Sequence, residues 1–384
     1  MMDLWGYILR RTDNDVILWS AAHRVGVFGS SRRTIGPFDR GVLVLSQGWC
    51  SLSIVDSFVR RIVDALPTAT GKVLIRDRAG HPVLVELVAQ ECVARELEPL
   101  IEHVSNDELR RVIATSSPAE LSGWDFGRAR VAAEIGGLIV LGGWRLDLAD
   151  LDPESVAAWA AAMGRVEAVI DSRRVPTVVV AVPTEDVATK LGLRIEALAA
   201  HVMPSILSSA SQLRAATDGV LKMLARGSSI ELCTPGGSLF VERGMRPLLI
   251  DDGVVDAADI RSGATVSNLP AGSVYWTVLE DATRGRVELI DGTVLEFGLD
   301  GRVAAGEFAG ERVSHLGIAT NPLVAGSIGW TIVDEHRPGA VFLALGENRY
   351  LGGANASAIN VDLLPASPTV LVGEAMLVAD GELV

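Results

Sequence analysis

The sequence predicts an α/β protein, with an N-terminal parallel-sheet α/β domain followed by a β-rich domain that is mixed α+β and barrel-like. Two patterns carry this prediction. In the first half, short apolar runs typical of buried strands alternate with segments of helical periodicity. After Gly227 the helical segments give way to short strand-like runs separated by Gly, Asp and Asn turns. At 384 residues the chain is long enough for two domains that each bury a core.

Strands and helices alternate along the predicted α/β domain. The expected elements are a helix over 58–66, a strand over 71–77, a helix over 83–95, a strand within 97–104, a helix over 107–113, a strand over 138–141, a helix from 152, a strand over 177–182 and a mostly helical stretch over 185–224. Asp152-Pro153-Glu154 is the best-defined helix start. The Asp side chain can accept hydrogen bonds from backbone N–H groups of the first turn that have no partner within the helix. Pro fits the first turn, and the negative charge of Glu is favourable at the positive end of the helix dipole.

The β-rich domain is predicted from six short apolar runs, at 230–233, 238–241, 247–250, 286–290, 293–297 and 369–372. We place the domain boundary near Gly227, so that residues 57–226 form the α/β domain and residues 227–384 the β-rich domain. Residues 1–56 are expected to form a small β-rich N-terminal extension or cap, because 16–19 and 42–45 are strand-like.

Composition limits the partners. The net charge is −14 and the pI about 4.9, which excludes nucleic acid and an anionic membrane surface and favours a neutral or cationic small ligand or peptide. The three cysteines have neither disulfide nor zinc spacing, as expected of buried thiols in a reducing cytoplasm. Charges interrupt every apolar stretch before about 18 residues, so no transmembrane helix is expected.

Three stretches in the C-terminal third carry a family resemblance. They are Asn268–Tyr275 (NLPAGSVY), His315–Pro322 (HLGIATNP), and 342–362, which opens with FLALG and closes with GGANASAINVD. The order and the amino-acid sequences of these stretches resemble those of the M29 family of metallo-aminopeptidases, also called aminopeptidase T or thermophilic metalloproteases. The resemblance implies the fold predicted above and a homodimer. It also implies a two-metal centre in which the metals polarise the scissile carbonyl and activate a bridging water.

The family's metal-ligand positions are mostly altered in this chain. In the family they hold Glu, Glu, His, His and Asp, and the matching positions here are Ser273, His315, Phe342, Asn360 and Asp362. Phe cannot ligate a metal, and Ser and Asn are weak neutral ligands. One carboxylate and one imidazole do not offset the dehydration of two ions, so the resemblance predicts the peptidase architecture without its dinuclear chemistry.

The residues that remain define a candidate site. His315, Asp362 and Tyr350 are the candidate catalytic residues, and the first two are also candidate ligands of a single metal. Ser273, Phe342, Asn360 and Asn355 are expected to line the cleft. Dihydroxypyridine-type dioxygenases, which resemble M29 proteins more distantly, hold one Fe(II) with two His and one Asp, and His315 and Asp362 match two of those ligands. The expected cofactor is therefore none or a single divalent metal.

Three functional hypotheses remain open at this stage. The first is a non-peptidase that binds a peptide or a partner protein in the old cleft, with a role in a biosynthetic pathway. The second is an enzyme with altered chemistry, either a mononuclear-metal oxygenase or a metal-free lyase or cyclase, acting on a small molecule or modified peptide. The third is an active aminopeptidase with displaced ligands such as Glu280, Asp281 or Tyr350. The acidic turn at 334–336 is given no role.

Overall fold

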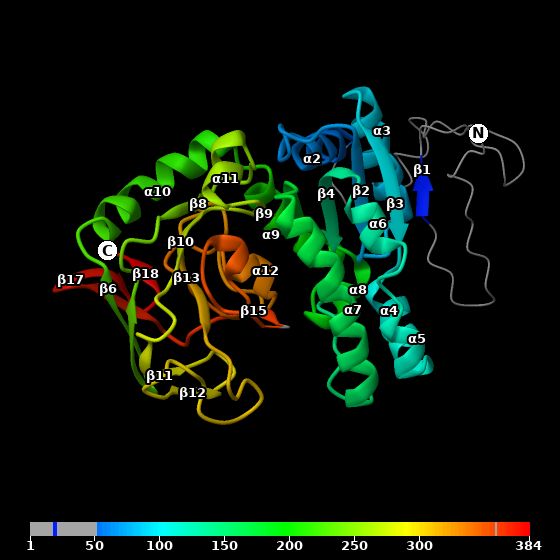
Figure 1. Ribbon diagram of the computed structural model, residues 1–384. Helices are drawn as coiled ribbons and strands as arrows, with labels where there is room; N and C mark the ends of the chain where they lie inside the picture. The colour runs from blue at the N-terminus through cyan, green and yellow to red at the C-terminus, as the bar shows by residue number, and fades with distance from the viewer. Residues whose placement is uncertain (1–17, 21–51, 358) are drawn as a thin grey trace, which may run out of the picture. The chain divides into compact units, whose positions relative to one another are not determined.

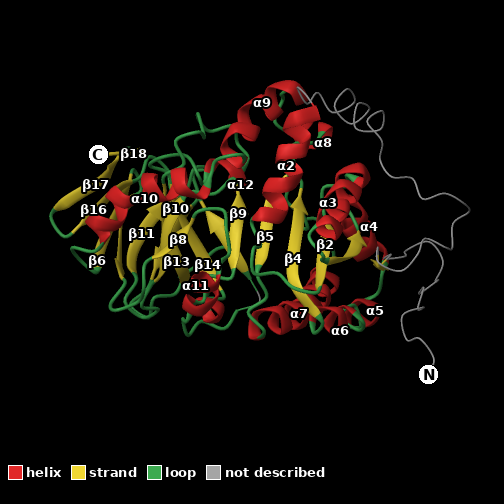
Figure 2. Ribbon diagram, turned by 90° about the horizontal axis from the view of Figure 1, so that it is seen from above, coloured by secondary structure: helices red, strands yellow, loops and turns green. Residues whose placement is uncertain are grey.

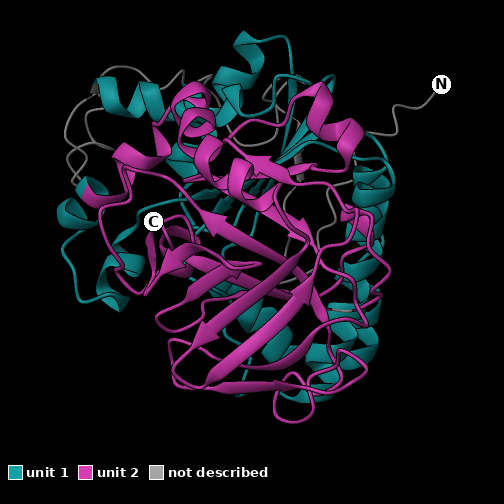
Figure 3. Cartoon of the chain, turned by 90° about the vertical axis from the view of Figure 1, so that its left-hand side faces the viewer, with its two compact units in different colours: residues 1–200 teal, residues 201–384 magenta. Residues whose placement is uncertain are grey.

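The computed structural model describes residues 18–20, 52–357 and 359–384, so most of the expected N-terminal extension lies outside the described residues. The chain divides into two compact units, the first ending at Ala200 and the second comprising His201–Val384 (Figure 3). Within the described residues no helix is long and apolar enough to cross a membrane.

The first unit contains the predicted parallel sheet. Its strands are β1 (Leu18–Ser20), β2 (Lys72–Asp77), β3 (Glu98–His103), β4 (Ile135–Gly142) and β5 (Thr177–Ala181). They lie in the order β1-β3-β2-β4-β5, with β2 parallel to both β3 and β4, β4 parallel to β5, and β1 antiparallel to β3. The central strands are nearly continuous buried runs, as expected when helices cover both faces of a parallel sheet.

Helices cover both faces of this sheet. The helices of the first unit are α2 (Leu52–Asp64), α3 (Pro82–Ala94), α4 (Asn106–Thr115), α5 (Pro118–Ser122), α6 (Arg128–Ala132), α7 (Pro153–Ser172) and α8 (Glu185–Lys190), and α9 (Ile195–Ile206) spans the boundary at Ala200 (Figure 1). Figure 2 shows α2 and α3 on one face of the strands and α6 and α7 on the other. The predicted start of α7 is confirmed, because Asp152 is its N-cap and accepts the Ser155 N–H at 2.9 Å.

The second unit is the expected β-rich, mixed α+β domain. It contains helices α10 (Ala210–Leu224), α11 (Ala257–Ser262) and α12 (Thr331–Asp334), the short helix η1 (Arg349–Leu351) and strand β9 (Val266–Leu269). A seven-stranded antiparallel sheet has the order β12-β11-β7-β6-β16-β17-β18. Its strands are β6 (Ser229–Thr234), β7 (Gly237–Glu242), β11 (Arg284–Glu288), β12 (Val294–Phe297), β16 (Thr369–Val372), β17 (Ala375–Ala379) and β18 (Glu382–Leu383).

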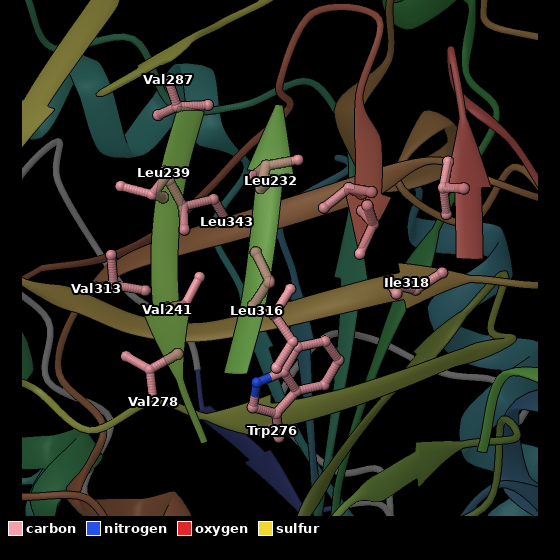
Figure 4. Packing of buried hydrophobic residues seen from close by; sticks show 14 of the residues in the cluster. Leu232, Leu239, Val241, Trp276, Val278, Val287, Val313, Leu316, Ile318 and Leu343 are labelled. Atoms are coloured by element: carbon pink, nitrogen blue, oxygen red, sulfur yellow. The ribbon is translucent and has the colours of Figure 1, made fainter. Parts of the chain in front are cut away.

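A five-stranded antiparallel sheet crosses the seven-stranded sheet of the same unit (Figure 4). Its strand order is β15-β14-β13-β10-β8. Its strands are β8 (Leu249–Asp251), β10 (Ser273–Thr277), β13 (Val313–Ala319), β14 (Val341–Gly346) and β15 (Asn360–Leu363). The apolar faces of the two sheets pack together: Trp276, Leu316 and Leu343 from one meet Leu232 and Leu239 from the other (Figure 4). The other face of the five-stranded sheet is therefore left for the site.

The compact units divide at Ala200, whereas the change in sequence character lies near Gly227. Helix α10 lies between these two positions, and its buried residues Val220 and Leu224 belong to the core of the second unit. The helix thus belongs by sequence pattern to the helical half and by packing to the β-rich unit, since its apolar stripe covers the strands that follow it.

Candidate functional site

Strand register brings the five candidate ligand positions to one face of the five-stranded sheet. Asp362 pairs with Ala344 of β14, and Ala344 pairs with His315 of β13. A neighbouring row runs from Phe342 through Gly317 to Tyr275. Residues opposite one another in an antiparallel sheet share a face, and residues two apart do so as well. We call this face, which carries Ser273, Tyr275, His315, Phe342, Asn360 and Asp362, the site face.

His315 lies at the centre of the site face, against two aromatic rings. Its ring meets Tyr275 and Phe342 edge-on, each with ring centroids 5.9 Å apart. Its Nε2 lies 3.5 Å from Asp362 Oδ1. His315 is almost fully buried, whereas the Asp362 side chain is 39% exposed. The pair predicted from sequence is therefore formed, with Asp362 on the solvent side.

A bulge in β13 fixes the orientation of the His315 ring. The strand register shifts at Ser314, whose hydroxyl donates to the Glu347 carbonyl at 2.8 Å. The same oxygen lies 3.0 Å from His315 Nδ1. Since the hydroxyl proton is already used, we assign Nδ1 as a donor to Ser314. In the tautomer with its proton on Nδ1, Nε2 carries a lone pair that lies beside the Asp362 carboxylate. An N–H or O–H group of a ligand can then donate to both of these acceptors.

Phe342 fills the space above Gly317. A methyl group added at Gly317 would lie 1.9 Å from Phe342 Cζ, so the ring rests directly on the glycine backbone. Phe342 packs there with the apolar residues Leu249, Ala264, Leu351 and Leu364. An aromatic wall thus stands at the position that the sequence resemblance matches to a histidine ligand of the metallo-aminopeptidases.

Asn360 and Tyr350 form a second polar pair at the exposed edge of the site face. Asn360 Nδ2 donates to Tyr350 Oη at 2.9 Å, and Asn360 is exposed. Tyr350, one of the candidate catalytic residues, therefore lies beside Asn360 at the edge of this face. Ser273 differs from these two residues because it is almost fully buried. In the strand register it lies opposite Asp251 of β8 and Ala319 of β13.

Three other sequence candidates, Asn355, Glu280 and Asp281, make hydrogen bonds or ion pairs with neighbouring segments. Asn355 donates from Nδ2 to the Val313 carbonyl at 3.0 Å, which ties its loop to β13. Glu280 is buried and accepts from Arg246 at 2.7 Å, Ala354 N–H at 2.7 Å and Asn348 Nδ2 at 3.1 Å. Asp281 is 81% exposed and pairs with Arg312. The carboxylate of Glu280 thus holds together the segments that contain Arg246, Asn348 and Ala354.

The acidic turn at 334–336, to which the sequence assigns no role, is buried. Asp334 accepts from Ser327 Oγ and from the N–H groups of Ile328 and Gly329, so it shapes the preceding loop. Glu335 is different, because its carboxyl group interacts electrostatically with Asp362 and His315. Burial, and next the charge of Asp362, raise the pKa of Glu335 well above its ordinary range. No short motif marks Glu335 in the sequence.

The donor set does not fit a two-metal centre. Within the described residues, no three His, Cys, Asp or Glu side chains converge as metal ligands. The two ionisable ligand positions, His315 and Asp362, approach one another, and the other three positions hold Ser, Phe and Asn. Dinuclear sites need several anionic or imidazole ligands.

Structural comparison identifies the class of fold as that of aminopeptidase T. AmpT of Thermus thermophilus superposes with a TM-score of 0.64 at 17% identity, covering 87% of this chain and 100% of AmpT. A 2,5-dihydroxypyridine dioxygenase of Pseudomonas putida KT2440 gives a TM-score of 0.53 at 12% identity, covering 86% of this chain and 96% of the dioxygenase. No family model and no curated protein sequence matches. The resemblance stated above is thus confirmed at the level of the fold.

Proposed function

We propose that this protein is a non-peptidase that binds a peptide or small molecule on the site face, without a dinuclear metal centre. The observation that carries the proposal is the register of the site face. The five residues that the sequence resemblance matches to the family's ligands share this face, and the one matched to an imidazole is Phe342, whose ring rests on Gly317. The scaffold that positions a ligand is retained, while the groups that would activate water on two metals are replaced.

The remaining groups are suited to bind hydrogen-bond donors. In the tautomer with its proton on Nδ1, His315 Nε2 and Asp362 Oδ1 are two acceptors 3.5 Å apart. Tyr275 and Phe342 supply apolar walls on either side of the imidazole. An amine, amide or hydroxyl group of the ligand can donate to both acceptors, and the overall charge of −14 favours neutral or cationic ligands.

The test uses the purified full chain. We expect no hydrolysis of leucine p-nitroanilide with added Co²⁺ or Zn²⁺, and binding of members of a tripeptide-amide library in ligand-observed NMR. Asp362→Asn should abolish this binding, whereas Asp281→Asn, at an exposed acid paired with Arg312, should leave it intact. Hydrolysis that disappears in Asp362→Asn would establish a working peptidase and contradict the proposal. A library with no binding member would contradict its peptide-binding part.

A metal-free lyase or cyclase is the second candidate, favoured by one observation. His315 is buried, its Nδ1 is anchored to Ser314, and its Nε2 faces Asp362, an arrangement suited to proton transfer. Under this alternative, His315→Ala would abolish turnover of the substrate while the chain remains folded. Under the binding proposal, ligands leave the wild-type protein chemically unchanged, which mass spectrometry of the recovered library checks.

A further inference from the structure

His336 is a buried residue whose ring is unsatisfied. The residue is 1% exposed, and neither Nδ1 nor Nε2 has a hydrogen-bond partner within the described part of the chain. Its backbone is well fixed, because its N–H donates to the Val333 carbonyl and its own carbonyl accepts from Asn321 N–H. A buried polar group without a partner is destabilising, and an apolar residue of similar size would avoid this.

Acidic groups surround the ring. Glu335 Oε1 lies 3.5 Å from His336 Nε2 without a hydrogen bond between them, and the charges of Asp251 and Asp362 also act on the ring. Burial lowers the pKa of His336, so at neutral pH the ring is uncharged and presents one N–H donor and one lone pair. Asp251 already accepts from Ser267 Oγ and from the Asn268 and Gly253 N–H groups.

A second unsatisfied atom belongs to the site face. Asp362 Oδ1 is buried and has no hydrogen-bond partner among the described residues, although the rest of its side chain reaches solvent. Glu335 connects the two, because it contacts His336 and its carboxyl group responds to the charge of Asp362. One N–H donor, one imidazole lone pair and one carboxylate oxygen are thus left for a ligand.

We infer that His336 and Glu335 form an inner subsite of the site face, which receives a neutral carboxamide group of the ligand. The inference rests on the proposed function and specifies its ligand. A carboxamide oxygen can accept from the imidazole N–H, and its two N–H groups can donate to the carboxyl oxygens of Glu335 and Asp362. A carboxylate would bring a second negative charge near Asp362, and an ammonium could not accept from the ring.

The experiment compares acetamide with acetate, which has the same shape and carries a negative charge. Protein labelled with ¹⁵N-histidine is titrated with each at pH 7, and the His336 signals are assigned by their loss in His336→Leu. We expect saturable shifts of the His336 ring nitrogens with acetamide and none with acetate. Absence of the acetamide response, or an equal response to acetate, would overturn the inner subsite.

Two variants separate a binding role from a structural one. Because the ring is unsatisfied, His336→Leu should have a Tm equal to or above that of the wild type and should no longer bind acetamide. His336→Asn retains a donor and an acceptor and should recover part of the acetamide binding. A lower Tm for His336→Leu would show that the ring supports the fold, and would contradict the inference.

The inner subsite can fail independently of the proposed function. If tripeptide amides bind, depend on Asp362 and are not hydrolysed, while acetamide leaves the His336 signals unchanged, the inner subsite is excluded and the binding function stands. If leucine p-nitroanilide is hydrolysed in an Asp362-dependent reaction, the proposed function is excluded, whatever the acetamide titration shows.

Discussion

At the scale of single residues, the site face differs from a metal centre through a few side chains with clear physical effects. Phe342 places an apolar ring on this face, and that ring requires the absence of a side chain at Gly317. Glu335 places a buried carboxyl beside Asp362 and His315. The first effect is steric and the second electrostatic, so each can be tested by one substitution and a matched control.

Replacing Gly317 by Ala should destabilise the protein by about 1–3 kcal/mol, because the new methyl group would overlap the Phe342 ring. Chemical denaturation of the variant measures the loss. In a Phe342→Ala background the ring is gone, and Gly317→Ala should then cost less than about 0.5 kcal/mol. An equal loss in both backgrounds would show that the glycine is required for another reason.

Glu335 should make the protein less stable as pH rises. Its pKa is raised in the folded state, so the folded chain holds this proton more tightly than the unfolded chain. The favourable contribution is complete below the ordinary Glu pKa of about 4.3 and is lost as pH rises through the folded value. Glu335→Gln should therefore flatten the pH profile of the free energy of unfolding and gain stability relative to wild type at high pH.

Urea denaturation from pH 5 to 9 measures this profile. Asp281→Asn, which alters an 81% exposed carboxylate, serves as the control and should leave the slope unchanged. A wild-type profile parallel to that of Glu335→Gln would show that this proton is not held more tightly in the folded chain.

At the scale of elements, the sequence was informative wherever local rules decide the structure. The predicted buried strands appear as β2 and β4, and Asp152 caps α7 as its Asp-Pro-Glu pattern indicated. Pairing between distant strands is set by tertiary contacts. The motifs could not show that Asp362 shares a row with His315, or that Ser314 forms a bulge that orients the imidazole.

The capping box at the start of α4 gives a prediction at this scale. The Ser105 side chain accepts from the Glu108 N–H, and the Glu108 carboxylate accepts from the Ser105 N–H. Ser105→Ala should lower the free energy of unfolding by about 1 kcal/mol, because a backbone N–H loses its partner. Thermal denaturation of the purified variants measures this loss. Ser105→Thr, which keeps a hydroxyl acceptor, should retain most of the wild-type stability in that measurement. Equal stability of all three proteins would show that the cap contributes nothing.

At the scale of the whole molecule, fold and chemistry are separable. The chain shares the architecture of AmpT at 17% identity, so the same fold tolerates extensive change of sequence. Sequence motifs identified that architecture and five of the positions on its site face. They did not reveal Glu335 and His336, because these residues follow the short helix α12 in a turn without a motif, and their importance comes from burial beside Asp362.

The central claim is that this chain carries no dinuclear metal centre, and metal analysis of the purified full chain tests it most directly. The protein should be prepared without chelator and examined by inductively coupled plasma mass spectrometry after exposure to Zn²⁺, Co²⁺, Mn²⁺ and Fe²⁺ followed by desalting. We predict fewer than two metal ions per chain. Two ions per chain that disappear in His315→Ala and Asp362→Ala would contradict the account.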